Sequence, residues 1–253
     1  MNLGRRLFKV WLRDLIVWSK YWHTSLVGAL GEPVLYFVGI GYGLGSFIPP
    51  IEGIPYVQYL APALIASSVM NSASFETTFS SFTRMEKQKT YASIAATPIS
   101  MEEVVAGEIL WGATKACLAG LVMLIAMVVA GLITPLGALW IAPVMGITAV
   151  LFSGLGMLAT SYAPDYDFFT YYFTLFLEPM FLFSGTFFPL SGMPVFLQKI
   201  VWILPLTPAV HLCRTLAQKG FDWNLLLPFS WILLLALFFC WFAIRRMVKR
   251  LVV

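Results

Sequence analysis

The chain alternates long apolar stretches with short polar or Gly/Pro-rich segments. A helix that crosses a bilayer needs about 20 mostly apolar residues, and six stretches approach or exceed that length. They lie at residues 25–47, 57–80, 104–131, 137–161, 168–188 and 224–244. Segments such as IPPIEGIP, TPLG and APDYD separate them. The pattern predicts an all-α integral membrane protein in which residues 1–253 form one domain with six transmembrane helices.

Composition supports the membrane assignment. Hydrophobic residues make up 60% of the 253 residues and charged residues only 11%. A soluble domain carries about 25% charged residues, so a chain this apolar cannot hide its surface from water in one core. The cysteines Cys117, Cys213 and Cys240 lie far apart and are expected to be small apolar packing residues. Neither a disulfide framework nor a metal site follows from them, and no nucleic-acid partner is expected.

The N-terminal segment, residues 1–23, has the pattern of a separate amphipathic helix. At about 100° per residue, its tryptophans fall on one face and its basic residues on the other. This pattern is typical of an interface helix that lies on membrane lipid with its bases toward anionic head groups. Packing against a partner helix is a second interpretation, and the two are compatible. The residues concerned are Trp11, Leu15, Trp18 and Trp22 on one face, and Arg5, Arg6, Lys9, Arg13 and Lys20 on the other.

Basic residues predict the orientation. Twelve of the sixteen Lys and Arg residues lie before the first span, in the loop after the second span, or after the last span. Lys and Arg concentrate on the cytoplasmic side of membrane proteins. We therefore expect a multi-pass protein of the cell inner (cytoplasmic) membrane whose N-terminus and C-terminus are cytoplasmic. The APDYD turn falls on the same side, although it has Asp165 and Asp167 and no base.

Residues 189–222, before the last span, contain apolar pieces that are too short to cross. These pieces, 195–204 and 209–217, are separated by the sequence PLTP at 205–208, and proline disrupts a helix interior. A re-entrant helical pair on the extracellular side fits this pattern, and an ordinary extracellular loop is the alternative. His211 and Arg214 lie three apart on the segment. They could meet an anionic head group or cap a re-entrant helix.

The loop after the second span is charged and broken into short pieces. Thr97 before Pro98 ends one helical piece, because the residue before proline disfavours the α region. Ser100 and Glu103 form an S-x-x-E capping box that starts the next helix. A short helix of small residues is therefore expected at about 88–96, shaped to dock into a groove on another protein. Its expected surface consists of Tyr91, Ala92, Ile94, Ala95 and Ala96.

A few residues within the spans are candidates for the substrate path. Glu178 lies about ten residues into the fifth span, and an ionisable residue inside a membrane is costly. It either borders the path or is a buried, hydrogen-bonded carboxyl. Lys115 lies on the same helix face as Glu108 and is expected to snorkel or to form a structural pair. Glu32 and Glu76 are expected to interact with basic residues or with the interface helix. Aromatic residues of the fifth span could line a path for a lipid-linked sugar or simply fill space; those singled out are Tyr172, Phe176, Phe183 and Phe187.

Four stretches resemble a known family. They are EPVLYFVGIGYGLG (32–45), SFETTFSSFTRMEKQKTYASIAATPIS (74–100), GEILWGATKA (107–116) and LEPMFLFSGTFFPLSGMPVFLQKIVWILPLTPAVHLCR (177–214). Together they resemble the permeases of type-2 ATP-binding-cassette (ABC-2) exporters, in the branch of nodulation protein J and of polysaccharide or lipo-oligosaccharide exporters. The resemblance extends over nearly the whole chain.

The resemblance implies a homodimer of permeases above two copies of a separate cytoplasmic ABC ATPase. Residues 84–100 would then be the coupling-helix loop that contacts the ATPase. Asp165 and Asp167 would make a second cytoplasmic contact. The chain has no G-x-x-x-x-G-K-[ST] loop, so no cofactor is expected in it, and the partner subunit would bind ATP and Mg²⁺. The coupling residues implied are Glu86, Lys87, Lys89, Thr90, Tyr91, Ile94, Thr97 and Pro98.

Two classes of function remain at this point. The first is the pore-forming permease of an ATP-driven exporter, without ATPase activity of its own. Its amphipathic substrate would be a lipid-linked saccharide, a glycolipid or a lipo-oligosaccharide, or, alternatively, a hydrophobic drug or antibiotic. The second is an ion-coupled secondary carrier, which usually shows internal repeats and matched ionisable sites at mid-membrane. The halves of this chain show no such repeat.

Overall fold

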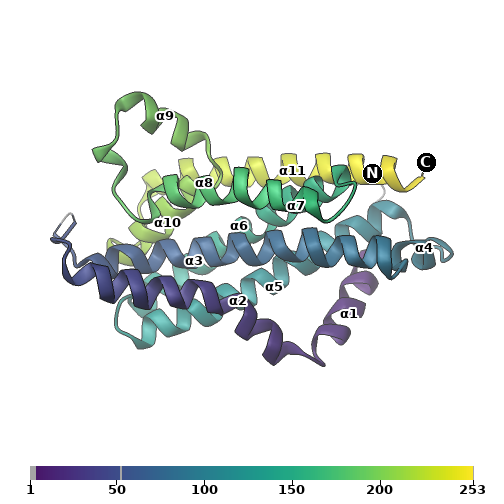
Figure 1. Ribbon diagram of the computed structural model, residues 1–253, viewed down its shortest axis with the longest axis horizontal. Coiled ribbons are helices and arrows are strands. Elements are labelled where there is room, and N and C mark those ends of the chain that lie inside the picture. Colours follow the sequence, from purple (N-terminus) through teal and green to yellow (C-terminus); the bar gives the residue numbers. More distant parts are fainter. Residues whose placement is uncertain (1–3, 52, 253) are drawn as a thin grey trace.

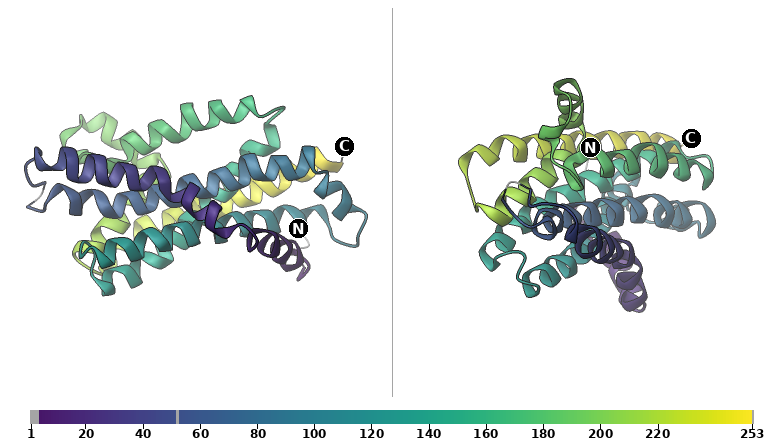
Figure 2. Two further views of the ribbon diagram at one scale, coloured as in Figure 1. Left: turned by 60° about the horizontal axis from the view of Figure 1, so that its bottom comes forward. Right: turned by 60° about the vertical axis from the view of Figure 1, so that its left-hand side comes forward.

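In the computed structural model, which describes residues 4–51 and 53–252, helices run side by side along one axis (Figures 1 and 2). The only extended pairing in the described part of the chain is a single bridge between Ile51 and Ile54. The all-α class is thus confirmed. The α-helices in chain order are α1 (Leu7–Trp18), α2 (Trp22–Tyr36), α3 (Tyr56–Phe75), α4 (Thr90–Ala95), α5 (Met101–Val129), α6 (Pro135–Tyr162), α7 (Asp167–Tyr172), α8 (Glu178–Phe181), α9 (Val195–Ile203), α10 (Leu206–Gln218) and α11 (Leu226–Val252).

Four helical stretches in the described residues are long and apolar enough to cross a membrane: Trp22–Ser46, Met101–Val129, Pro135–Tyr162 and Trp223–Leu251. The pair α9 and α10 qualifies as a fifth only if the two are taken together as one bent span. The remaining two predicted spans, 57–80 and 168–188, are helical as well. They are less apolar than the four stretches above or are interrupted by π turns, which are wider than α-helical turns. The count of six spans therefore stays a prediction.

The interruptions in these helices follow the sequence. Segment α2 contains Pro33 and passes into a π segment at Phe37–Gly43, as expected where proline removes a backbone donor. Segment α3 continues through π turns at Glu76–Ser80 and Thr83–Lys87. Pro179 follows the π turn Phe173–Leu177, and a further π segment, Leu182–Thr186, ends the predicted fifth span.

Helix α6 lies at the centre and packs against α3, α5, α10 and α11. Its threonine N-cap and the proline at its first position begin it at the predicted turn after residue 134. The main core is shared by α3, α5, α6, α8 and α10. A second, smaller core lies around Tyr91, where residues of α1, α4, α5, α7 and α11 meet.

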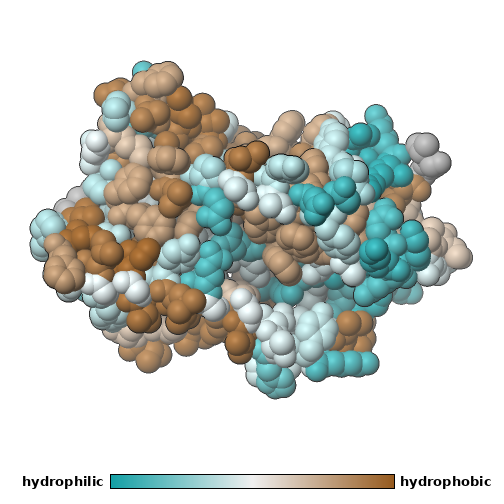
Figure 3. Space-filling view, in the orientation of Figure 1, coloured by the Kyte–Doolittle hydropathy of each residue, from teal (hydrophilic) through white to brown (hydrophobic). Residues whose placement is uncertain are grey.

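The two ends of the bundle differ in what they carry (Figures 1 and 2). One end, called here the α4 end, holds both described chain ends, α1, α4 and the turn at 163–167. The opposite end, called the α9 end, holds residues 47–51, 53–55 and 130–134 together with α9. Hydrophilic residues gather at the α4 end and hydrophobic ones cover α9 (Figure 3). The predicted grouping of the termini with the 84–100 loop is therefore seen in the structure.

The segment before the last span is folded into two short helices, as predicted, but their boundary differs. Helices α9 and α10 meet at an angle of 95°. The bend lies at Leu204 and Pro205, and Thr207 and Pro208 already belong to α10. The prediction of a break extending through 208 was wrong because proline is tolerated in the first helical turn, where its missing N–H has no partner to lose.

Candidate functional site

Helix α4 presents small side chains to the surface of the α4 end. It is shorter than the 88–96 expected, because Lys89 adopts a left-handed conformation with φ of 52° just before it. The predicted capping box is confirmed: Ser100 and Glu103 bond each other's backbone N–H at the start of α5. Ala92, Ala95 and Ala96 are exposed. Helix α4 is therefore compact and exposed, and it lies between the left-handed residue Lys89 and the capping box that begins α5.

Tyr91 is not part of that surface. It is 2% exposed, and its hydroxyl lies 2.5 Å from the Ser81 hydroxyl. Its ring packs in the second core, with Val104 and Val105 of α5 and Met247 of α11. The expectation of an exposed Tyr91 was wrong, because a large aromatic ring gains more by burial against neighbouring helices than a six-residue helix can provide alone. Tyr91 anchors α4, and Ile94 is half-buried beside it.

The other residues predicted for coupling lie around α4 in different settings. Glu86 pairs with Lys89 and with Arg250 of α11, each at 3.4 Å. Lys87 is exposed, and the Thr97 hydroxyl donates to the carbonyl of Ile94. The carbonyl of Pro98 accepts from Arg6, next to α1. Thr90 lines a cavity, described below.

The two aspartates predicted as a second contact are exposed at the same end of the molecule. Asp165 accepts a hydrogen bond from the backbone N–H of Phe168 at 3.1 Å and so closes the first turn of α7. Asp167 is the first residue of α7. Acidic residues at the start of a helix interact favourably with the helix dipole. Both aspartates therefore also have a structural role at the start of α7, apart from any contact with a partner protein.

A buried ion-pair network lies behind α4, and the sequence analysis did not assemble it. Arg84, after α3, donates to Glu76 at 2.8 Å and to Glu108 of α5 at 2.9 and 2.7 Å. Glu76 also accepts from Lys115 at 2.7 Å and from the Trp111 ring N–H at 3.0 Å. Glu108 is fully buried and Glu76 is 2% exposed. The segment that leads from α3 to α4 and the helix that follows α4 are thereby tied together.

Helix α1 joins this network from the side. Arg13 donates to Asp14 and, at 2.8 Å, to Glu108. The expectation that Arg13 faces lipid head groups was wrong, because the buried carboxylate of Glu108 attracts it more strongly than a water-exposed anion does. Burial raises the pKa of Asp14 to about 6, and the charge of Glu108 adds to this, against the lowering effect of Arg84 and Arg13. Trp11 donates to Thr114 at 3.0 Å, so α1 packs on α5.

The expected structural pairing of Lys115 is confirmed. Its partner is Glu76 of the segment after α3 and not Glu108 on its own helix, although both glutamates belong to the same network. The expected pairing of Glu76 with basic residues is confirmed. Ionisable residues in otherwise apolar helices indicated in the sequence that buried ion pairs would form, because such groups need partners when buried. Spacing along one helix could not show which other helix supplies the partner.

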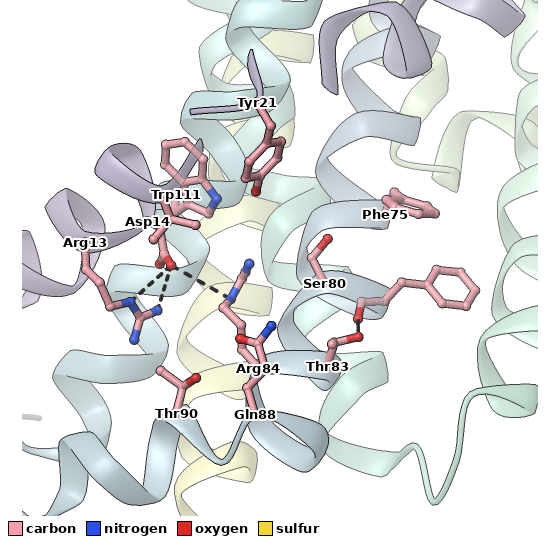
Figure 4. A pocket seen from close by; sticks show the side chains of 12 residues that line it. Arg13, Asp14, Tyr21, Phe75, Ser80, Thr83, Arg84, Gln88, Thr90 and Trp111 are labelled. Carbon is pink, nitrogen blue, oxygen red and sulfur yellow. Dashed lines mark hydrogen bonds and ion pairs between the residues drawn. The ribbon is translucent and has the colours of Figure 1, made fainter. Parts of the chain in front are cut away.

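Two adjoining cavities lie along α3. The first, of about 430 Å³, lies between α1 and the end of α3, and its lining includes Asp14, Arg84, Gln88 and Trp111 (Figure 4). The second, of about 510 Å³, lies between α2, α3 and the segment at 173–178. Tyr21, Phe75 and Ser80 line both cavities. The two therefore form one groove, with both apolar and polar side chains in its lining, that leads from the α4 end toward the middle of the bundle.

Glu178 lies in the second cavity, together with Glu32 and Lys115. Of the residues predicted for a substrate path, it is the one found among the residues lining the two cavities. Phe176 and Phe183 are exposed on the outside of their helix.

The remaining two path candidates pack within the protein. The ring of Tyr172 stacks on Phe176, and its hydroxyl lies 3.5 Å from that of Ser74. Phe187 packs against Tyr36 and Phe181. Since the aromatic candidates point in several directions, the structure does not gather them into one lining.

The two ionisable candidates on α10, Arg214 and His211, lie in different surroundings. Arg214 donates to the carbonyls of Tyr59 at 3.1 Å and Gly185 at 2.8 Å, and its guanidinium lies 3.6 Å from the centre of the Tyr59 ring. It thus holds α10 to α3 and to the left-handed turn at Gly185, where φ is 78°. His211 is exposed, with its ring 5.3 Å from that of Trp202 on α9.

Comparison with known proteins identifies a family and several relatives. The family model described as ABC-2 type transporter matches residues 5–217. The chain is 40% identical over 205 residues to nodulation protein J of Sinorhizobium fredii, covering 81% of this chain and 78% of that protein. It is 39% identical over 211 residues to nodulation protein J of Rhizobium leguminosarum bv. viciae, covering 83% and 82%. It is 26% identical over 203 residues to the inner membrane transport permease YadH of Escherichia coli, covering 79% and 78%.

These names and the apolar helices fit a non-enzymatic transport subunit in the membrane. The match extends over the α4 region, the buried ion-pair network and both cavities, and ends within α10. The chain therefore belongs to the ABC-2 type transporter family.

Proposed function

We propose that this chain is the pore-forming permease subunit of an ATP-driven exporter that moves an amphipathic substrate outward across the inner membrane. Two copies form the transport path, and two separate cytoplasmic ATPase subunits bind ATP and Mg²⁺ beneath them. The α4 end faces the cytoplasm, and the α9 end faces outward with α9 and α10 as the re-entrant pair. The substrate is a lipid-linked saccharide, a glycolipid or a lipo-oligosaccharide.

The observation that carries the proposal is the exposed α4 in a chain of the ABC-2 type transporter family. Helix α4 is supported by a dedicated core and by the network around Arg84, yet its outer face consists of small side chains. A connector between two spans could be much shorter. A rigidly supported helix with a smooth outer face is suited to receive a force from a second protein and to pass it into α3 and α5.

The substrate class is supported by the groove along α3. It combines carboxylates, hydroxyls and amides with aromatic rings, a mixture that suits a polar head group joined to an apolar chain. The relatives named nodulation protein J and the resemblance to polysaccharide or lipo-oligosaccharide exporters favour a saccharide over a hydrophobic drug. Membership of the ABC-2 family also weighs against an ion-coupled carrier.

Co-purification tests the function. The chain is tagged and expressed with a candidate ABC ATPase subunit from the same organism, and the purified material is assayed for ATP hydrolysis. We expect a stoichiometric ATPase, and at least about tenfold less of it with the double variant Ala92→Glu and Ala96→Glu, because two charges would be buried unpaired in the interface. The exposed Lys219→Glu at the α9 end is the matched control and should retain the partner.

The proposal fails if the ATPase remains bound to the double variant, or if the chain purifies alone and transports under a proton or sodium gradient. The second result would favour the carrier and make Glu178 the first residue to substitute.

A further inference from the structure

Helix α11 carries a continuous stripe of exposed side chains along its length. At about 100° per residue, the members of the stripe fall within a sector of about 80°. The opposite face, with Ile232, Ala236 and Ala243, is buried, and α11 packs on α6. Figure 1 shows that the helix runs along the bundle and ends beside the C-terminus at the α4 end. The exposed stripe includes Leu227, Leu234, Phe238, Trp241, Arg245 and Lys249.

The length of this stripe matches the thickness of a membrane. Arg245 lies 18 residues after Leu227, which is about 27 Å at 1.5 Å per residue. The hydrocarbon core of a bilayer is about 30 Å thick. With Leu227 near one boundary, Trp241 lies just inside the other, at the depth where tryptophan is enriched. Arg245 and Lys249 then lie among the lipid head groups.

Three bases near the end of α11 form no ion pair within the part of the chain that the structure describes. They are Arg245, Arg246 and Lys249. The helix dipole favours bases within the last turn only, so it accounts for Lys249 and not for the other two. Arg246 packs over the ring of Tyr162 at 4.6 Å. Arg245 and Lys249 remain exposed on the stripe.

These two bases repel each other. They lie four residues apart on the same helix face, where like charges destabilise a helix. An anion between them would replace the repulsion by two charge-assisted contacts. The guanidinium carbon of Arg245 lies 5.8 Å from the centre of the Trp241 ring, so the cationic and apolar parts of the stripe adjoin. The surface therefore suits a ligand that has an anionic group joined to an apolar chain.

The apolar part of the stripe near these bases has the length of one acyl chain in one leaflet. Leu234 lies 11 residues before Arg245, or about 16 Å along the helix, which is about half of the hydrocarbon core. Clusters of Lys and Arg beside a transmembrane helix commonly bind anionic lipids. An acidic protein from the aqueous phase would contact the two bases but not the apolar side chains within the membrane. Charge and depth together favour a lipid.

We propose that Arg245 and Lys249 share the phosphate of an anionic phospholipid in the membrane leaflet at the α4 end, while one of its acyl chains lies along Trp241, Phe238 and Leu234. The bound lipid removes the repulsion between the two bases and covers the exposed side of α11. This interaction goes beyond the export function and needs no ATPase subunit.

Lipid binding to the purified full-length chain tests the inference. The probes are dioleoyl-phosphatidylglycerol and dioleoyl-phosphatidylcholine, which share their acyl chains and differ in the net charge of the head group. Each is titrated into the chain in a neutral maltoside detergent, and bound lipid is counted by native mass spectrometry. We expect phosphatidylglycerol to bind at least about tenfold more tightly. Glycerol 3-phosphate in about hundredfold excess should not displace it, because it has no acyl chain to bury.

Paired variants locate the site. Arg245→Gln with Lys249→Gln should weaken phosphatidylglycerol binding about tenfold, because both charges that face the phosphate are lost. Lys9→Gln with Lys20→Gln is the matched control. It removes two exposed bases from α1 and the turn after it, and the affinity should stay within about twofold of the native value. Trp241→Ala should weaken binding about threefold, because the acyl chain loses an aromatic contact.

Equal binding of the two lipids would overturn the inference, because the site would then not recognise the anionic head group. A loss of affinity in the Lys9 and Lys20 control as large as that in the Arg245 and Lys249 variant would indicate diffuse charge attraction instead of a site. Displacement by glycerol 3-phosphate would identify a site for soluble phosphates. A dimer that persists without lipid and is lost in Trp241→Ala would assign the stripe to a second copy of the chain.

Discussion

At the scale of single residues, Arg84 is the side chain on which the α4 end depends most. Its guanidinium bonds carboxylates from two different helices, and only 13% of its side chain is exposed. Burial makes such an arrangement costly to break, because removing one partner leaves the others charged and unpaired in a poorly solvated place. An exposed pair such as Lys89 with Glu86 costs little to break, because water solvates the charge that is left unpaired.

We therefore predict that Arg84→Met lowers the stability of the purified chain by about 3–5 kcal/mol. Glu76 and Glu108 lose their shared cation, although Lys115 and Arg13 still reach one each. The measurement is the midpoint of thermal aggregation in detergent. Lys89→Met is the matched control, with an expected effect of at most about 1 kcal/mol. Equal midpoints for the two variants would show that the network is not a stabilising element.

At the scale of elements, α3 and α6 approach each other closely because glycine allows it. A Cβ atom added to Gly156 of α6 would overlap the Thr77 side chain and lie 3.2 Å from the backbone oxygen of Ser74. The contact is reinforced by the Thr160 hydroxyl, which donates to the carbonyl of Thr77 at 2.7 Å. Close approach of helices through small residues is a common mode of association in membranes.

Gly156→Ala should accordingly destabilise the chain by about 1–3 kcal/mol, since the backbones of α3 and α6 must move apart. Gly146→Ala in the same helix is the control. No atom lies within 4 Å of its added Cβ, and alanine is the better helix former, so its stability should be unchanged or up to about 1 kcal/mol higher. The comparison uses thermal midpoints of both variants in one detergent, and a loss at Gly146 equal to that at Gly156 would contradict it.

At the scale of the whole molecule, the α4 end forms one connected unit. Arg250 near the end of α11 donates to the carbonyls of Thr160 and Ala163 in α6 and reaches Glu86 beside α4. Trp11 and Arg13 hold α1 to α5, so side-chain bonds connect the surroundings of α4 with α1, α5, α6 and α11. The hydrophilic surface in Figure 3 coincides with this unit, as expected for the part of a membrane protein that meets water.

The predicted orientation can be checked on intact cells. In a chain whose cysteines are replaced by alanine, Lys219→Cys at the α9 end should react with a membrane-impermeant maleimide added outside. Ala95→Cys on α4 should react only after the membrane is permeabilised. Both positions are exposed, so accessibility depends on the side of the membrane. Labelling of Ala95→Cys in sealed cells would reverse the orientation.

The sequence by itself determined the features that depend on neighbours along the chain. The helical class, the capping box at Ser100 and Glu103 and the short helices on both sides of Pro205 follow from local patterns of polarity, capping residues and prolines. The grouping of the termini with α4 at one end was predicted from the basic residues concentrated in those segments. Membrane insertion follows from composition, since no folding of this chain could bury so much apolar surface in water.

Only the tertiary structure decided which distant groups meet. Tyr91 turns inward because α5 and α11 provide a core there, and Arg13 leaves the lipid face because Glu108 lies 95 residues further along the chain and within 2.8 Å. Lys115 pairs with Glu76, and Glu178 opens into a cavity beside α2. Charge pairing and burial act through space, where the alternatives are helices separated by long stretches of sequence. A pattern read along one helix cannot rank those partners.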